Sequence, residues 1–471
     1  MPSQTAPERR NTSHGRRARN GGSANSGSAG GPGRGARRAQ PAQARPTAPV
    51  PVKLHPRPGL LGTHLQLQQL VLLEVAVALV AVGWTINAAM AGVFAVPAVL
   101  LVIVALLPLN GRSAPEGLRV RMAFNARRKQ AQLNVPPPGT DPALAPALEL
   151  EPALHTYTHA TEADLGNGRP VRRETGMVGD GTFLTSVLLV QAKDQPLRPT
   201  RTSLPLPLDV ICSALQVDDI ALESVQLVQH TQPAPAPHLP EQSLATRAYH
   251  QLPDGLSTPG LRLTWIALKL SPELTSAAVV ARGGGDEGAR KALQRVTDQL
   301  AGRLNSAGFT ATALDERELI AALAISTCAN PIAVAGRQGT GGGGGNGRRT
   351  QESRKFWRID DRWHSTYWIS KWPVLSRPGG TPGRIAAPDL VNLVTGTPAL
   401  ASTFSLTASQ GTGGSVAISG HVRVTGRSES EVDQVGRLVE SRAQSAGVSL
   451  TRLDLEQAPG LLATLPLGGT S

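Results

Sequence analysis

The longest apolar segment of the chain covers residues 65–109 and contains one formal charge, Glu74. About 20 helical residues cross the apolar core of a bilayer, so a segment of this length predicts two helices, 65–84 and 88–109, joined by a short turn. Trp84 falls where an interfacial aromatic residue is expected. We therefore predict a transmembrane helical hairpin.

Beyond residue 175, short apolar segments with strand and helix periodicity occur twice in the same order. The first copy has strands at 182–192, 224–230 and 260–270, a short helix at 208–216, and a helix followed by a strand at 290–315. The second copy has strands at 363–372, 402–408 and 414–424, a short helix at 388–396, and a helix followed by a strand at 431–454. Each long helix is followed by Ser-Ala-Gly, which places Gly308 and Gly447 at left-handed helix ends.

Each copy therefore reads strand, helix, strand, strand, helix, strand, which is the ferredoxin-like order. We predict an α+β fold in which the N-terminal transmembrane hairpin is followed by a cytoplasmic domain of two ferredoxin-like (βαββαβ) repeats. The repeats are expected at residues 175–330 and 351–471.

Three low-complexity segments separate these units. Residues 1–58 form a basic arm that we expect to be disordered because it has few apolar residues. Residues 112–154 combine a basic helix, predicted at 118–133, with a Pro-rich linker, and residues 336–350 form a Gly-rich linker.

The net charge of +13 is concentrated on both sides of the apolar segment. Residues 1–58 contain eleven Lys or Arg and one acid, and residues 112–129 contain six bases and one acid. Since basic residues near the ends of a span stay on the cytoplasmic side, this pattern predicts a cell (inner) membrane protein with two spans and both termini cytoplasmic. The bases favour contact with anionic lipid headgroups, and the near-neutral remainder argues against nucleic-acid binding.

Two Gly-rich segments were considered as phosphate-binding loops. The tract ending at residue 350 has no Lys followed by Ser or Thr, which a P-loop requires. The segment at 283–288 opens a helix with acids, which repel phosphate. We expect no nucleotide and no other cofactor.

His155 and His159 have the i, i+4 spacing of two ligands on one helix face. No Cys or acid lies between them, so a surface pair is favoured. Asp360 and Asp361 are adjacent and flanked by arginines, which favours a turn with local ion pairs over an acid–base pair. We predict no catalytic, cofactor-binding or metal-binding residues.

Glu74 would be costly inside a bilayer, and contact with a partner helix and structural tolerance are equally open for it. Ala88 and Gly92 have a spacing suited to close helix packing. Cys212 and Cys328 are the only cysteines, and a small buried apolar role is favoured over a disulfide.

The whole layout resembles EccE, a membrane component of the actinobacterial type VII (ESX) secretion system. The residues that carry the resemblance are RPGLLGTHLQLQQLVLLEVAVALVAVGW (57–84), LLPLNGR (106–112) and DRWHSTYWISKWP (361–373). The resemblance implies a non-enzymatic accessory subunit that assembles with EccB, EccC and EccD, with ATPase activity in EccC.

Two other classes of function remain open from the residues alone. The chain would also suit a membrane-anchored sensor or regulator with duplicated ligand-binding αβ domains. A membrane-tethered nucleic-acid binder is disfavoured by the charge of the large domain. No small-molecule substrate is expected for the secretion subunit.

Overall fold

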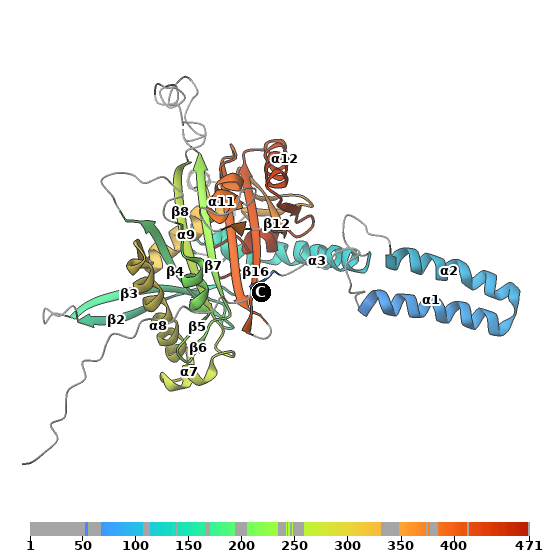
Figure 1. Cartoon of the computed structure of the whole chain (residues 1–471), viewed down its shortest axis with the longest axis horizontal. Helices are drawn as coiled ribbons and strands as arrows, with labels where there is room; N and C mark the ends of the chain where they lie inside the picture. Colours follow the sequence, from blue (N-terminus) through green and yellow to red (C-terminus); the bar gives the residue numbers. More distant parts are fainter. Residues whose placement is uncertain are drawn as a thin grey trace, which may run out of the picture. The chain divides into compact units, whose positions relative to one another are not determined.

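Most strands of the described residues belong to one large sheet, as seen in a computed structural model (Figure 1). The structure describes residues 52–54, 67–106, 114–134, 136–137, 140–164, 170–193, 205–233, 242, 244, 247, 259–330, 348–373, 375–376, 385–411 and 414–469.

The main sheet has thirteen strands, in the order β10-β11-β12-β16-β15-β7-β8-β4-β3-β2, with β1, β9 and β17 pairing to its side. Apart from β1, which pairs parallel to β16, these neighbours are antiparallel. The strands are β1 (Val52–Leu54), β2 (His155–Asp164), β3 (Pro170–Gly179), β4 (Leu184–Ala192), β7 (Ser224–Pro233), β8 (Pro259–Leu270), β9 (Phe309–Ala313), β10 (Thr350–Glu352), β11 (Trp357–Ile359), β12 (Arg362–Lys371), β15 (Ala401–Gln410), β16 (Val416–Gly426) and β17 (Ser449–Arg452). Two small sheets pair β5 (Gln216–Val217) with β6 (Ile220–Ala221) and β13 (Leu375–Ser376) with β14 (Ile385–Ala386).

The helices come before, between and after these strands. Their bounds are α1 (Leu67–Ile86), α2 (Ala88–Leu106), α3 (Ala114–Leu133), α4 (Ala145–Leu150), α5 (Leu208–Cys212), the 3-10 turn η1 (Ser213–Leu215), α7 (Ser276–Ala281), α8 (Gly285–Ser306), α9 (Glu316–Thr327), α11 (Ala387–Thr395), α12 (Glu429–Ser445) and α13 (Gln457–Leu462).

The two halves of the sheet have the same connectivity. In the first half the strands lie in the order β9-β4-β8-β7, and in the second half the order is β17-β12-β16-β15. A short hairpin precedes each half, β2–β3 or β10–β11, and a helix follows each, α9 or α13. The strand and helix positions expected from the repeated pattern are confirmed, including the left-handed glycines Gly308 (φ 95°) and Gly447 (φ 75°).

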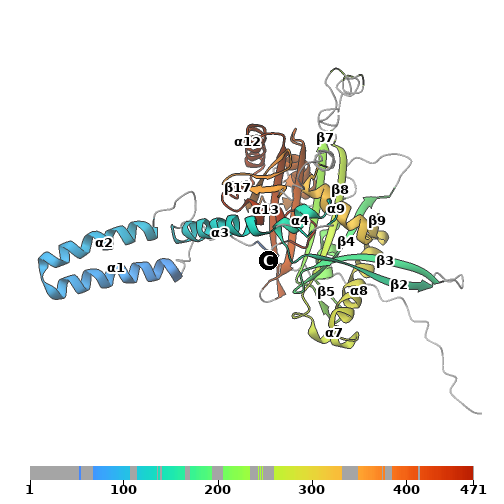
Figure 2. The same ribbon diagram turned by 180° about the vertical axis from the view of Figure 1, so that it is seen from behind.

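Helices cover both faces of the sheet. Since neighbouring residues of a strand point to opposite faces, each strand contributes side chains to two layers of the core. Leu188 of β4 packs with α5, α7 and α8, whereas Val187 packs with α4 and α9. In the second half, α11 and α12 cover the first of these faces and α13 covers the second. The helices can be followed against the sheet in two opposite views (Figure 1, Figure 2).

The predicted fold class is wrong in two respects. The class is α+β, but the two ferredoxin-like repeats are replaced by one continuous antiparallel sheet. The physical reason is that β7 of the first half pairs with β15 of the second from Ser402–Thr231 to Ser409–Ser224. Because helices cover both faces, the central strands are buried on both sides, which a small sheet with helices on one face cannot provide.

The predicted transmembrane hairpin is the second correction. Helices α1 and α2 form close to the expected positions, but polar Gln68, Gln69 and Glu74 lie within α1 and Pro97 lies within α2. Among the residues that the structure describes, none of the helices combines the length and apolarity needed to cross a bilayer. The two predicted spans and the orientation deduced from them are therefore not supported.

The linkers are only partly as predicted. The Pro-rich linker contains α4, whose Ala147 is buried in the core together with Leu144 and Leu154. Val52–Leu54, inside the arm predicted to be disordered, form β1 on β16. The rest of the arm and residues 331–347 of the Gly-rich region lie outside the described residues.

Helix α8 offers a matched pair of glycines that tests its packing. A Cβ at Gly288 would overlap the carbonyl oxygen of Val279, whereas a Cβ at Gly302 would meet nothing within 4 Å. We predict that Gly288→Ala lowers the free energy of unfolding by about 1–3 kcal/mol through overpacking. Gly302→Ala should raise it by roughly 0.5–1 kcal/mol through helix propensity. Denaturant unfolding of the full chain measures both, and equal effects would contradict the packing of α7 on α8.

Candidate functional site

A buried polar seam lies in the middle of the sheet, on the face covered by α9 and α13. Its centre is Arg423 of β16, a fully buried side chain. Arg423 Nη2 donates to the carbonyl oxygen of Ser326 at the end of α9, and to Thr403 Oγ1 at 3.2 Å. Among the described residues, its Nε and Nη1 have no hydrogen-bond acceptor. The seam therefore holds a guanidinium that is only partly satisfied by neutral groups.

Two buried histidines lie on either side of this guanidinium, one on the adjacent strand β12 and one on β7, two strands away. His230 Nδ1 of β7 lies 3.0 Å from Thr403 Oγ1, and His364 Nδ1 of β12 lies 2.9 Å from Thr425 Oγ1. The seam thus links β7, β15, β16 and β12 to α9, and it crosses from one half of the sheet to the other.

Burial determines the charge state of the seam. It lowers the pKa of Arg423 to about 10, so this side chain stays charged at neutral pH. Burial, and then the charge of Arg423, lower the pKa of His230 to about 3 and the pKa of His364 well below 6.5. Burial raises the pKa of the Cys328 thiol, which donates weakly to Thr425. At neutral pH the seam holds one cation, neutral imidazoles and a protonated thiol.

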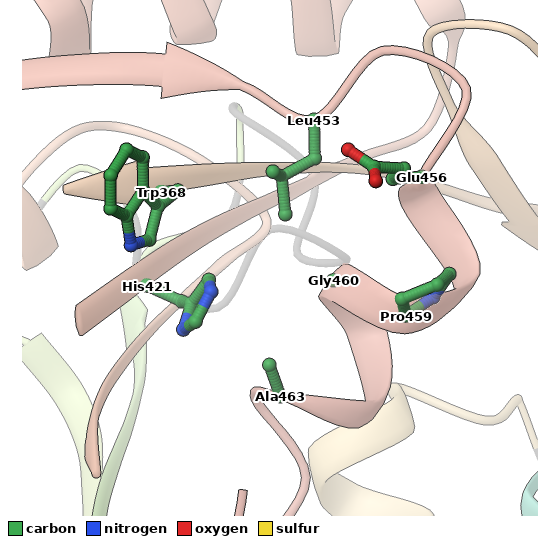
Figure 3. Close-up of a pocket in the computed structure, with 7 residues that line it drawn as sticks. All are labelled: Trp368, His421, Leu453, Glu456, Pro459, Gly460 and Ala463. Carbon is green, nitrogen blue, oxygen red and sulfur yellow. The ribbon is translucent and has the colours of Figure 1, made fainter. Parts of the chain in front are cut away.

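A small pocket opens beside the seam (Figure 3). It has a volume of about 220 Å³ and is lined by Trp368, His421, Leu453, Glu456, Pro459, Gly460 and Ala463. In Figure 3, Trp368 and His421 rise from the sheet, and Pro459 and Ala463 come from the helical segment opposite. The aromatic wall and the carboxylate give this pocket the chemistry of a contact site for a small polar group.

A larger cavity, of about 450 Å³, lies between α3, α4, β10 and α13. Its walls are held by charged contacts. The buried carboxylate of Glu149 accepts from the backbone N–H of Arg349 and of Thr350, each at 2.8 Å. Arg127 of α3 pairs with Glu352 of β10 at 3.1 Å. These contacts attach α3 and α4 to the edge of the sheet.

The acidic pair Asp360–Asp361 does not form an acid–base pair, and the pair His155–His159 does not have the geometry of two ligands on one helix face. Asp360 and Asp361 occupy the turn between β11 and β12, where Asp360 binds Arg349 at 2.6 Å and Asp361 binds Arg362 at 3.4 Å. The prediction of a turn with ion pairs is confirmed. His155 and His159 lie on strand β2, where i, i+4 residues are about 13 Å apart. The expected surface pair is half correct, because His159 is buried.

The small residues of the helical hairpin fall into two groups, exposed and buried. Ala88 and Gly92 are exposed, and a Cβ at Gly92 would meet nothing within 4 Å. Within the hairpin itself the helices come close at Gly83, where a Cβ would lie 2.9 Å from Ala91 Cα, and the prediction that Ala88 and Gly92 pack on a partner helix stays a prediction. Glu74 is exposed on α1.

The structure also locates the Gly-rich segment 283–288 and the two cysteines. The segment 283–288 opens α8 with Asp286 and Glu287 in its first turn, as expected. Cys212 and Cys328 are both free thiols. Within the described part of the chain, we find no group of three metal-ligating side chains.

The local sequence pattern does not predict the seam. Its only signal was Arg423 inside the strand segment GHVRVTG, together with single histidines in β7 and β12. A lone polar residue in an alternating strand indicates the solvent face when one side of the sheet is open. Here both faces are covered, so the same pattern places the charge in the interior.

One segment of the chain matches the model of a known protein family. The model of EccE, the type VII ESX secretion system translocon family, matches residues 258–369. The matched segment begins just before β8 and ends inside β12, so it contains α9. None of the curated proteins compared with the chain matches it. The resemblance to EccE is thereby confirmed over this segment of the chain.

The seam makes the fold sensitive to acid. The unfolded chain protonates His230 near pH 6.5, but the folded chain does so only near pH 3. The contribution of His230 to the free energy of unfolding is therefore fully present above pH 6.5. It falls by about 1.4 kcal/mol for each pH unit below that value, down to the pKa of the folded state. We predict that His230→Gln flattens the loss of stability between pH 6.5 and 4.5, measured by denaturant unfolding. The exposed His155→Gln is the control, and an unchanged pH profile for His230→Gln would contradict the buried, neutral imidazole.

Proposed function

Because residues 258–369 match EccE, we propose that this chain is a non-enzymatic accessory subunit of a type VII protein secretion complex at the cell membrane. This match is the observation that carries the proposal. The proposed partners are the other membrane subunits EccB, EccC and EccD, with ATP hydrolysis performed by EccC.

The architecture supports a role in binding. The seam around Arg423 joins the two halves, so they share buried polar contacts within one sheet. The β2–β3 hairpin pairs along its whole length, whereas β3 pairs with β4 only from Met177 to Gly179. The hairpin thus extends past the sheet, and β2 is the last strand of the described order. An outer strand of this kind is suited to adding a strand from a partner.

The helical pair α1–α2 supports association with the membrane. Large apolar side chains are exposed on it, with exposed fractions of 69% for Val77, 74% for Trp84 and 69% for Val96. Many exposed large apolar side chains on one helical pair are typical of a protein or membrane contact. We propose that it holds the chain in the membrane-bound assembly.

A ligand-binding sensor is the alternative function. The cavity of about 450 Å³ has a volume within the range of small-molecule sites. Charged side chains that already pair with one another line much of it, such as Arg127 with Glu352. The family match favours the secretion subunit.

We predict that Val77→Asp combined with Val96→Asp lowers the share of the protein in the membrane fraction and its recovery with other secretion subunits. The reason is that two carboxylates on an apolar contact surface are costly to desolvate. Gentle detergent extraction of the tagged full chain, with identification of co-purifying proteins, measures the second effect.

Leu438→Asp on α12 is the matched control, since Leu438 is also an exposed apolar residue. It should behave as the parent protein does. Recovery of the parent chain without any secretion subunit would contradict the proposed function.

A further inference from the structure

Helix α3 is fixed in rotation by contacts on its inner side. Arg127 donates from Nε and Nη2 to the two carboxylate oxygens of Glu352, at 3.1 and 3.2 Å, and from Nη2 to the carbonyl oxygen of Leu455 at 2.6 Å. Arg348 donates to the carbonyl oxygen of Ala131 at 2.6 Å. Val120 and Phe124 on the same side are buried. The opposite side of the helix therefore has a defined direction relative to the sheet.

That outer side carries an exposed apolar stripe. The exposed fractions are 59% for Leu118, 56% for Met122 and 83% for Leu133. At about 100° per residue, these three side chains fall within an arc of roughly 60°. Isolated exposed apolar residues are common, but here three share one side of the same helix, with Met122 and Leu133 about three turns apart.

Basic side chains border the stripe on both sides. Arg121 and Arg128 lie on one flank and Arg119 on the other, and Lys129 lies within the stripe. All four are exposed, and the one acid of α3 is Glu116 in its first turn. Among the described residues, the ion pair of this helix with another element is made by Arg127 on the inner side.

An apolar stripe bordered by bases suits a helix that lies in the plane of an anionic bilayer surface. Each base near such a surface contributes attraction, and Lys129 can extend its ammonium to the headgroups while its methylenes stay apolar. An acidic partner protein would account for the bases alone but not for the Leu and Met stripe between them.

We propose that the outer face of α3 lies on an anionic lipid surface. The stripe enters the boundary between headgroups and acyl chains, and the flanking arginines bind lipid phosphates. Because Arg127 and Arg348 clamp the inner face, this contact sets the orientation of the whole sheet relative to the membrane. The inference rests on the proposed function only in that the chain works at a membrane.

The test follows an environment-sensitive label on α3 of the full chain. In a Cys212→Ser, Cys328→Ser background, Met122→Cys is labelled with a nitrobenzoxadiazole dye and reconstituted into vesicles. The vesicles are phosphatidylcholine alone or phosphatidylcholine with phosphatidylglycerol. With the anionic lipid, we expect a blue-shifted emission and protection from aqueous iodide. A label at Gly302→Cys, exposed on α8, should stay open to iodide in both vesicle types.

Charge removal gives the quantitative prediction. Arg121→Gln with Arg128→Gln should lower the ratio of lipid-contacting to water-exposed label by roughly thirty-fold in anionic vesicles. Arg172→Gln with Arg437→Gln removes two exposed bases from β3 and α12, and it should leave the ratio unchanged. Unfolding midpoints equal to the parent's show that both variants fold.

Two results would overturn the inference. One is a label at position 122 as open to iodide as the label at 302, and the other is equal lipid contact in neutral and anionic vesicles. Retained co-purification with secretion subunits would then show that the proposed function stands while the lipid surface does not.

Discussion

Pairing of β7 with β15 is the interaction on which the rest of the structure depends. Without it, each half would expose the edge of a strand, which invites non-native pairing. With this pairing, both faces of the sheet extend from one half into the other. Segments of each half also contact the other half. The carbonyl oxygen of Ser326, at the end of α9 in the first half, accepts a hydrogen bond from Arg423 Nη2 of the second half. In the other direction, Ser224 Oγ of the first half donates to the carbonyl oxygen of Gly468 in the C-terminal segment at 2.6 Å.

Local sequence patterns predicted most elements of the sheet domain. Apolar alternation located β8 and β16, and Ser-Ala-Gly located the ends of α8 and α12 at Gly308 and Gly447, because these signals depend on residues close in sequence. Helix α9 was missed although Asp315 and Glu318 form a capping box in which Glu318 N donates to Asp315 at 2.8 Å. That signal was present in the sequence as Asp-Glu-Arg-Glu.

Long-range features were not accessible from the same patterns. The joining of the halves requires edge strands far apart in sequence to recognise each other, and no local period records this. The burial of Arg423 follows from coverage of the second face by α9 and α13, and the clamp of α3 depends on Glu352, more than two hundred residues away. The resemblance to EccE, carried by segments such as 361–373, predicted the family match over residues 258–369, whereas the apolar content of α1 and α2 suggested spans that the structure does not support.

Hydrogen exchange of the full chain tests most directly whether the two halves form one cooperative sheet. Amides of β7 and β15 should open with the same free energy as those of β8 and β16, because all four strands belong to one unit. Exchange of β15 and β16 at one free energy and of β7 and β8 at another would contradict this account. It would mean that the halves unfold independently and that their pairing does not hold the sheet together.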